Sequence, residues 1–395
     1  MGKQALEDIK VIDLTAAVSG PFSTQLLGDF GANVIKIEPP GTGDMLREVG
    51  PFHKGEGYYF MLNNRNKRSM TLNLKTEKGV EILKELVKEA DVLVENFRPG
   101  VKKKLGIDYE TLTAINPKLI YCSISGFGQT GPYANRPGFD PIAQGISGLS
   151  SVTGFKESGP VRVGVAIGDA LAGIFATYGI LLAIIERETS GQGQRVESSL
   201  LEGLIAVLGP QAAKYFATGE RPEANGNDHP MLSPFGAFKT KDGYLNIGAG
   251  YQKIWERMAR LMDLESLISD ERFLKVGDRF GNNAELTKIM EEKLIHKTTV
   301  EWENIFNEGG VPNGPIKYID EVFEDEQVLH QEMLIEKNHP RLGKTKMIGF
   351  PAKLSRTPAS VRLTPPDLGE HTANILEELG YSLERIKKMR EDKVL

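Results

Sequence analysis

The chain has 395 residues, of which 40% are hydrophobic and 26% are charged. At roughly 100–200 residues per domain, this length predicts two domains with substantial cores. The net charge of −5 excludes the global positive field typical of nucleic-acid-binding proteins. The single cysteine, Cys122, excludes an intrachain disulfide and is typical of a reducing compartment. Because residues 1–10 show no signal peptide, we expect a cytoplasmic protein.

Short β-branched runs alternate with helical stretches through about the first 200 residues. The expected strands are 11–14, 33–37, 69–74, 91–95 and 119–123. The expected helices are 21–30, 78–89 and 170–185. This alternation predicts an α/β fold with an open, mostly parallel sheet and helices on both faces.

The run 170–185 is uncharged and lies between Asp169 and Glu186. It is shorter than the roughly 20 residues that a membrane-spanning helix needs. We therefore interpret it as a helix buried in a protein core, and we expect no membrane partner.

The pattern changes after about residue 220. Runs 235–239 and 244–247 flank Lys241-Asp242-Gly243, which predicts a β-hairpin. Helices are expected at 255–262, 284–296 and 300–308, followed by a helical tail at 373–378 and 383–390. These elements indicate a second, smaller α+β domain.

Motifs for a tightly bound cofactor or metal are missing. The turn after the first strand, residues 15–21, lacks the G-x-G-x-x-G pattern that lets a dinucleotide pyrophosphate approach a helix. None of the six histidines lies three to five residues from another, so no zinc-ligand pattern is present. We expect no metal and no tightly bound cofactor.

Two kinds of segment beside expected strand ends suit a phosphorylated ligand. A glycine-rich loop, Gly126-Phe127-Gly128-Gln129-Thr130-Gly131-Pro132, follows the strand 119–123. Ligands of open α/β sheets bind at the carboxyl ends of strands, although an ordinary turn has the same composition. Basic residues also gather there, and they suit either several phosphates or a solvated surface: Arg65-Asn66-Lys67-Arg68, Lys75, Arg98 and Lys102-Lys103-Lys104.

Asp169 has two interpretations. An aspartate at the start of a helix commonly caps it, because its oxygen accepts the free N–H groups of the first turn. An aspartate facing a cleft can instead act as a nucleophile. The neighbouring Gly168 allows the close approach of a ligand, which makes the second role possible.

Six motifs in order favour the second interpretation. They are Gly31-Ala32-Asn33-Val34-Ile35-Lys36-Ile37-Glu38, Gly43-Asp44-Met45-Leu46-Arg47, Asn64-Arg65-Asn66-Lys67-Arg68-Ser69, Glu95-Asn96-Phe97-Arg98-Pro99-Gly100, the glycine-rich loop, and Gly168-Asp169 with its helix. In this order the chain resembles the class III coenzyme A transferases, which include formyl-CoA transferase and carnitine CoA-transferase. The resemblance runs from about Leu6 to the C-terminal end.

The resemblance implies a Rossmann-like α/β domain formed by both chain ends, with a smaller α+β domain inserted, and two subunits interlocked as a homodimer. The expected boundaries are 1–190 for the first part of the large domain, 225–326 for the small domain and 351–395 for the return. Residues 191–224 and 327–350 would be linkers.

The resemblance also implies the site. Asp169 would be the catalytic nucleophile, and acyl-CoA and a carboxylic acid would be the substrates. The expected coenzyme A contacts are Leu72, Asn73, Leu74, Lys75, Asn96, Phe97, Arg98, Lys104, Phe139 and Asp140. Val18 and Pro39 or Pro40 stand where formyl-CoA transferase has a glutamine and an arginine, so those contacts would differ.

The implied reaction moves coenzyme A from an acyl-CoA thioester to an acceptor carboxylic acid. An ionised aspartate needs no general base to attack the thioester. The aspartyl anhydride and the aspartyl-CoA thioester that follow would both keep the acyl group activated. Backbone N–H groups near Gly168 or at 248–250 are hypothetical oxyanion donors. Two alternatives remain. One is an α-methylacyl-CoA racemase, a related group that needs a histidine where this chain has Phe139. The other is a non-catalytic CoA-binding protein in which Asp169 only caps its helix.

Overall fold

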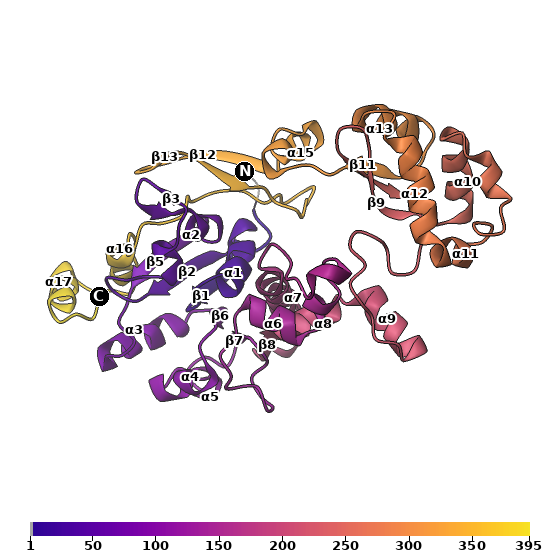
Figure 1. Cartoon of the computed structure of the whole chain (residues 1–395). Coiled ribbons are helices and arrows are strands. Elements are labelled where there is room, and N and C mark those ends of the chain that lie inside the picture. Colours follow the sequence, from indigo (N-terminus) through magenta and orange to yellow (C-terminus); the bar gives the residue numbers. More distant parts are fainter. Residues whose placement is uncertain (1–2) are drawn as a thin grey trace. The chain divides into compact units, whose positions relative to one another are not determined.

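The computed structural model describes residues 3–395, which divide into two compact units (Figure 1). The large unit contains the residues up to Ser147, Gly164–Val207 and Glu326–Leu395. The small unit contains Gly148–Val163 and Leu208–Asp325. Both ends of the chain therefore contribute to the large unit, and the small unit is inserted between them.

The large unit is built on a six-stranded sheet in the order β5-β2-β1-β6-β7-β8. All its neighbouring strands are parallel. The strands are β1 (Lys10–Asp13), β2 (Asn33–Glu38), β5 (Lys67–Thr71), β6 (Val92–Glu95), β7 (Ile120–Ser125) and β8 (Arg195–Ser199). In chain order this is the doubly wound arrangement, whose direction reverses between β1 and β6. Ligands of such sheets bind in the crevice outside the carboxyl ends of the strands at that point.

Helices and short strands surround this sheet. The helices of the large unit are α1 (Ser19–Asp29), α2 (Tyr58–Leu62), α3 (Glu77–Val87), α4 (Pro99–Leu105), α5 (Tyr109–Thr113), α6 (Asp140–Ile146), α7 (Ile167–Ser190), α8 (Leu200–Ala206), α15 (Glu326–His330), α16 (Thr372–Glu378) and α17 (Leu383–Glu391). Its remaining elements are η1 (Met45–Glu48), β3 (Phe52–His53), β4 (Glu56–Gly57) and the hairpin of β12 (Leu334–His339) and β13 (Gly343–Ile348).

The core of the large unit joins the two chain ends. Ile82 and Leu83 of α3 are buried in one cluster with Ile12 of β1 and with Ile375 and Leu376 of α16. The amphipathic spacing of α3 places its apolar residues on one face. The C-terminal segment is thus part of the domain core, as the resemblance implied.

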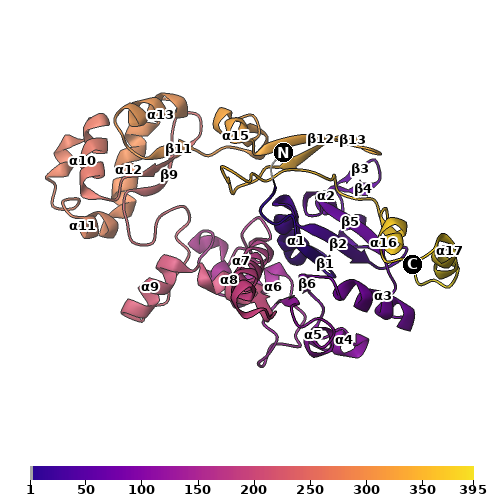
Figure 2. The same ribbon diagram turned by 180° about the vertical axis from the view of Figure 1, so that it is seen from behind.

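Helices α1 and α7 lie side by side in both views (Figure 1 and Figure 2). The hydroxyl oxygens of Ser23 and Thr177 are 2.9 Å apart across this contact. A Cβ at Gly173 would lie 2.6 Å from the carbonyl oxygen of Ser19. Only glycine allows this close approach, which positions the first turns of both helices.

Helix α7 has 24 residues and extends beyond the expected 170–185 at both ends. By length and composition it could cross a membrane, a test that the core helix of a folded domain also meets. Its buried side packs on α1, β7, β8 and α8. Its other side carries exposed apolar residues, so the prediction of a wholly buried helix is wrong.

The small unit holds a three-stranded sheet in the order β11-β10-β9. Strands β9 (Phe235–Lys239) and β10 (Tyr244–Gly248) form the predicted hairpin, and β11 (Asn313–Pro315) pairs with β10. The remaining elements are η2 (Leu149–Ser151), η3 (Lys156–Ser158), α9 (Gly209–Thr218), α10 (Gln252–Leu261), η4 (Glu265–Ile268), α11 (Val276–Gly281), α12 (Asn283–Leu294), α13 (Thr299–Glu308) and α14 (Ile319–Val322). Its core surrounds Trp255 and Phe306.

The segment boundaries differ from the expected ones in three places. The expected linker 191–224 contains β8, α8 and α9, and the expected linker 327–350 contains the β12–β13 hairpin. Residues 148–163 lie in the small unit instead of the large one. The polar strand β8, Arg195–Ser199, lacks the apolar run that marks the other strands, so its pairing with β7 decides its structure.

Candidate active site

Asp169 is the third residue of α7 and does not cap it. The N-cap residue is Ala166, which has no side-chain capping bond. The carboxylate that serves the helix start comes from Asp140, whose Oδ1 accepts the N–H of Gly168 at 2.7 Å. Asp140 therefore takes the role that the alternative interpretation gave to Asp169.

Asp140 and Gly168 form a tightly packed joint between α6 and α7. The Nε2 of Gln144 donates to Asp140 Oδ2 at 2.7 Å, which orients the carboxylate from within α6. A Cβ at Gly168 would lie 3.0 Å from Asp140 Oδ1, so a side chain there would press on this bond. The glycine before Asp169 thus makes room for a carboxylate of the same chain.

Burial raises the pKa of Asp169 to about 6, and the negative charge of Asp140 adds to the increase. A hydrogen bond from the Ser19 hydroxyl opposes both effects. The carboxylate is still mostly ionised at neutral pH, while it is more basic than an ordinary aspartate. Such a shifted, partly buried carboxylate is typical of functional sites.

Two residues near Asp169 escaped the sequence analysis. Ser19 begins α1, and Tyr59 lies on α2. Burial, followed by the charges of Asp169 and Asp140, raises the pKa of Tyr59, so its hydroxyl stays protonated near the carboxylate. In the sequence, only the position of Ser19 after a strand end pointed to this site. The long-range packing of α1, α2 and α7 brings these residues together, so local patterns could not reveal them.

A pocket of about 300 Å³ lies at the carboxyl ends of β1, β2, β5 and β6. This is the crevice at which the strand order reverses. Its walls are largely apolar and are formed by Leu14, Thr15, Ala16, Ile37, Glu38, Pro39, Gly43, Asp44, Leu72, Asn73, Leu74, Lys75, Phe97, Val101 and Leu105. Such a pocket suits an apolar ring system with a charged tail at its rim.

Five of the expected coenzyme A contacts line this pocket, namely Leu72, Asn73, Leu74, Lys75 and Phe97. Lys104 lines a neighbouring hollow together with Leu74 and Lys75. Both lysines are exposed, as phosphate contacts require.

The other four expected contacts do not line the pocket. Asn96 exchanges two hydrogen bonds with Ala16, at 3.0 and 2.7 Å, and so holds the pocket wall. Arg98 is the exposed N-cap residue of α4. Phe139 is 63% exposed, and Asp140 is buried at the start of α7. The position of a residue in a motif did not show whether it lines the pocket or supports a residue that does.

Several basic residues that suited a phosphate site are instead buried in ion pairs. Arg65 pairs with Asp29 at 2.7 Å, and Lys67 pairs with Asp13 at 3.0 Å. Lys102 donates to Glu95 and to Gln129 of the glycine-rich loop, both at 2.7 Å. These cations stabilise loops at the strand ends, because a buried charge requires a partner.

The hypothetical oxyanion donors are already engaged. The N–H of Gly168 binds Asp140, and the N–H of Gly248 binds the carbonyl of Pro312 at 2.9 Å. The N–H of Gly168 is bonded because the first N–H groups of a helix need acceptors from outside the helix. The N–H of Gly248 is bonded because β10 lies inside a sheet. Both N–H groups therefore already have acceptors in this structure, and the oxyanion hypothesis stays a prediction.

Comparison with known proteins gives a consistent result. Residues 6–372 match CoA-transferase family III. The chain is 41% identical to succinyl-CoA:glutarate CoA-transferase of Mus musculus, over 97% of this chain and 88% of the relative. It is 39% identical to succinyl-CoA–D-citramalate CoA-transferase of Chloroflexus aurantiacus, over 95% of this chain and 94% of the relative.

Solved structures agree. A CaiB/BaiF family protein from Brucella suis superposes with a TM-score of 0.85 and 37% identity, covering 96% of this chain and 100% of that one. The family match spans both units, and the relatives match over almost their full length. The chain belongs to CoA-transferase family III and is an enzyme of that family.

Proposed function

We propose that the enzyme moves coenzyme A from an acyl-CoA thioester to an acceptor carboxylic acid through covalent intermediates on Asp169. The observation that carries the proposal is the state of Asp169. It is partly buried, its pKa is raised to about 6, and Asp140 relieves it of helix capping. A free and unusually basic carboxylate at the start of a helix is suited to nucleophilic attack.

The reaction balances without added water or protons. A carboxylate oxygen of Asp169 attacks the thioester carbonyl, the carbon–sulfur bond breaks, and a mixed anhydride and CoA thiolate form. The thiolate attacks the aspartyl carbonyl and releases the donor acid, which leaves an aspartyl-CoA thioester. The acceptor carboxylate then displaces the thiolate, and the thiolate takes the new acyl group from the second anhydride. Asp169 is regenerated as a carboxylate.

The pocket between β1 and β6 is the proposed site for the coenzyme A end of the substrate. Its apolar walls suit a nucleotide base, and exposed Lys75 and Lys104 provide charges for phosphates. Residues 15 and 16 line this pocket, and the same loop leads to Ser19, which contacts Asp169. One short segment thus links the binding pocket to the nucleophile.

A succinyl donor and a dicarboxylic acceptor are the proposed substrates. The supporting fact is that relatives at 41% and 39% identity are named for succinyl-CoA with glutarate and with D-citramalate. A panel of carboxylic acids with succinyl-CoA and acetyl-CoA as donors tests this. Clear preference for acids with a single carboxylate would contradict it.

An interlocked homodimer is also proposed. The exposed side of α7 carries an apolar stripe at helical spacing, Ile174, Tyr178, Leu182 and Ile185, of which Tyr178 is 59% and Ile185 67% exposed. A continuous exposed apolar stripe of this kind is typical of a protein–protein interface. A stable monomer of 43.5 kDa in sedimentation would contradict the dimer.

The covalent step is tested by Asp169→Ala and Asp169→Asn. We expect both variants to lose transfer by at least about 10³-fold while coenzyme A still binds, because the removed oxygen forms the reactive bond. Hydroxylamine added during turnover should place a mass shift on the wild-type peptide that contains Asp169. Undiminished transfer by Asp169→Ala would contradict the proposal.

The racemase alternative is separated by incubation of an acyl-CoA in deuterated water. Exchange at the α-carbon without an acceptor acid would support it. We expect no such exchange, because Phe139 cannot carry a proton and Asp140 is engaged by Gly168 and Gln144.

A further inference from the structure

Ala17 has a backbone conformation that a residue with a side chain rarely adopts. Its φ angle is +66°, in the left-handed region, where the Cβ crowds the backbone. It lies in the β1–α1 loop, defined here as residues 14–18, which joins the central strand to α1. Surrounding contacts must hold such a residue in place.

Asp44 provides one of these contacts from a different segment. Its Oδ1 accepts the N–H of Ala17 at 3.1 Å and the N–H of Leu46 at 3.0 Å. The other oxygen forms an ion pair with Lys36 at 2.9 Å. Both side chains are almost fully buried, so their charges are held in a fixed geometry.

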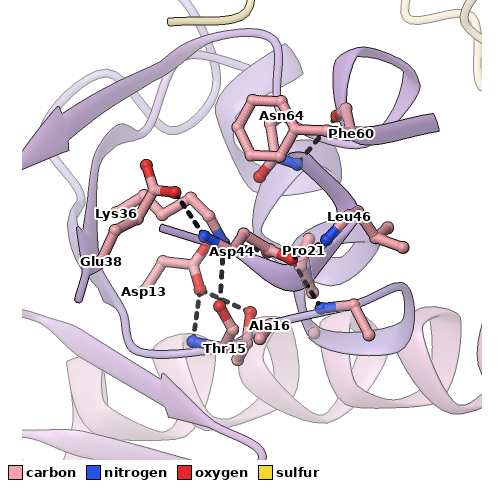
Figure 3. Close-up of polar contacts among 12 residues, drawn as sticks. Asp13, Thr15, Ala16, Pro21, Lys36, Glu38, Asp44, Leu46, Phe60 and Asn64 are labelled. Carbon is pink, nitrogen blue, oxygen red and sulfur yellow. Dashed lines mark hydrogen bonds and ion pairs between the residues drawn. The ribbon is translucent and has the colours of Figure 1, made fainter. Parts of the chain in front are cut away.

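Lys36 completes the attachment of the loop. Its Nζ donates to the carbonyl of Thr15 at 2.8 Å, so Lys36 and Asp44 hold two successive parts of the β1–α1 loop (Figure 3). Asp44 is itself fixed to the end of β2, because its N–H donates to Glu38 at 2.9 Å. The Gly43–Arg47 motif thus supports a loop that is distant in sequence.

The loop continues directly into the first residue of α1. Ser19 follows Ala17 by two residues, and its hydroxyl lies close enough to Asp169 to lower the pKa of that carboxyl group. The carbonyl of Ser19 also lies against Gly173 of α7. A change in the backbone at Ala17 would therefore move the Ser19 hydroxyl relative to the carboxylate.

We propose that Asp44 is a positioning residue for the transfer reaction: by holding Ala17 it directs Ser19 toward Asp169. This inference rests on the proposed role of Asp169 as nucleophile. The titratable groups whose interaction with that carboxylate is resolved are Asp140 on α6 and Tyr59 on α2. The effect of Asp44 passes through the loop.

The test measures the rate at which hydroxylamine traps Asp169 in a single turnover of the full-length enzyme with the preferred acyl-CoA. This rate is plotted against pH, and its acidic limb reports the ionisation of Asp169. Ser19→Ala removes a bond that favours the ionised carboxylate, so the limb near pH 6 should move to higher pH. Asp44→Ala should move it in the same direction, with about a tenfold lower maximal rate. Asp44→Asn should have a smaller effect, because its amide oxygen can still accept the N–H of Ala17.

The double variant Ser19→Ala/Asp44→Ala separates positioning from general destabilisation. If Asp44 acts through Ser19, the limb of the double variant should lie no higher than that of Ser19→Ala. The matched control is Asp29→Asn, a buried carboxylate at the far end of α1 that pairs with Arg65. It should lower stability and leave the limb in place.

An unmoved limb in Asp44→Ala would overturn the proposal, as would additive shifts in the double variant. If Asp44→Ala does not fold, Asp44→Leu decides, because leucine is similar in size and also lacks an acceptor for the N–H of Ala17, and an unmoved limb there is contradictory. Failure of this inference differs from failure of the proposed function. In the first case Asp169→Ala is inactive and only the Asp44 effect is missing, whereas in the second case Asp169→Ala remains active.

Discussion

The large unit buries carboxylates in two regions that differ in their neighbours. Under the β1–α1 loop, Asp13 and Asp44 lie beside Lys67 and Lys36, at 3.0 and 2.9 Å. At the start of α7, Asp169 has another carboxylate, Asp140, as its neighbour. The first two carboxylates are almost fully buried beside cations, whereas Asp169 is partly buried beside an anion. The charge of the neighbours therefore separates a supporting carboxylate from the proposed nucleophile.

The pKa values follow from this contrast. Burial alone would raise the pKa of Asp13, but Lys67, Lys36 and the Thr15 and Thr24 hydroxyls outweigh it and hold the pKa below the ordinary range. Burial and Asp140 together raise the pKa of Asp169 to about 6. A compensated carboxylate is inert, whereas one with a raised pKa is a better nucleophile that remains ionised at pH 7.

The largest expected effect lies in the compensated region. Lys67→Met would leave Asp13 buried with only part of its compensation, so we expect a loss of about 3–5 kcal/mol in the free energy of unfolding. Urea denaturation at pH 7 measures it. The control Asp13→Asn/Lys67→Met removes both charges and should recover part of the loss. A loss below about 1 kcal/mol would show that the two regions differ less than their geometry indicates.

The opposite sign is expected at Asp169, the proposed nucleophile. Because the folded-state pKa of Asp169 lies above its unfolded value of 3.8, ionisation destabilises the fold as the pH rises through that interval. Asp169→Asn should therefore raise stability above pH 6, by up to about 3 kcal/mol, and have little effect below pH 4. Thermal unfolding across this range measures it. The control is Asp13→Asn, because Asp13 is a buried aspartate with a lowered pKa, and its neutralisation should lower stability at pH 7.5. A loss at pH 7.5 would contradict the comparison.

A smaller effect is expected from the neighbouring carboxylate. Asp140→Asn removes the negative charge while its amide oxygen can still accept the N–H of Gly168. The pH limb of Asp169 trapping should therefore move to lower pH. Asp140→Ala should also lower the free energy of unfolding by about 1 kcal/mol, because the capping bond is lost. A limb that moves upward in Asp140→Asn would show that Asp140 acts on Asp169 other than by its charge.

Much of the fold was predictable from local patterns. The strands at 33–37 and 91–95, and the hairpin around Lys241-Asp242-Gly243, occur as β2, β6 and the β9–β10 pair. These segments carry β-branched runs and turn residues whose preferences act over a few residues. The polar strand β8 was missed because its structure depends on pairing with β7.

The candidate site divides in the same way. The family resemblance placed Asp169 and residues 72–75 in the expected site, and five of the ten expected coenzyme A contacts line the pocket. Asn96 and Asp140 are expected ligand contacts, and the structure shows that they also hold Ala16 and Gly168. A motif indicates that a residue has a role. It does not indicate whether the residue contacts the ligand or supports another residue that does.

By itself, the sequence determined the alternating α/β elements and the family resemblance that makes Asp169 the expected nucleophile, because these depend on local preference or on ordered motifs. Tertiary structure alone decided that Asp140 caps α7, that Lys36 and Lys67 are buried, and that Asp44 holds Ala17. The physical reason is that charge compensation and capping act through space, between residues up to tens of positions apart. Those contacts determine which carboxylate is paired with cations and which has a raised pKa.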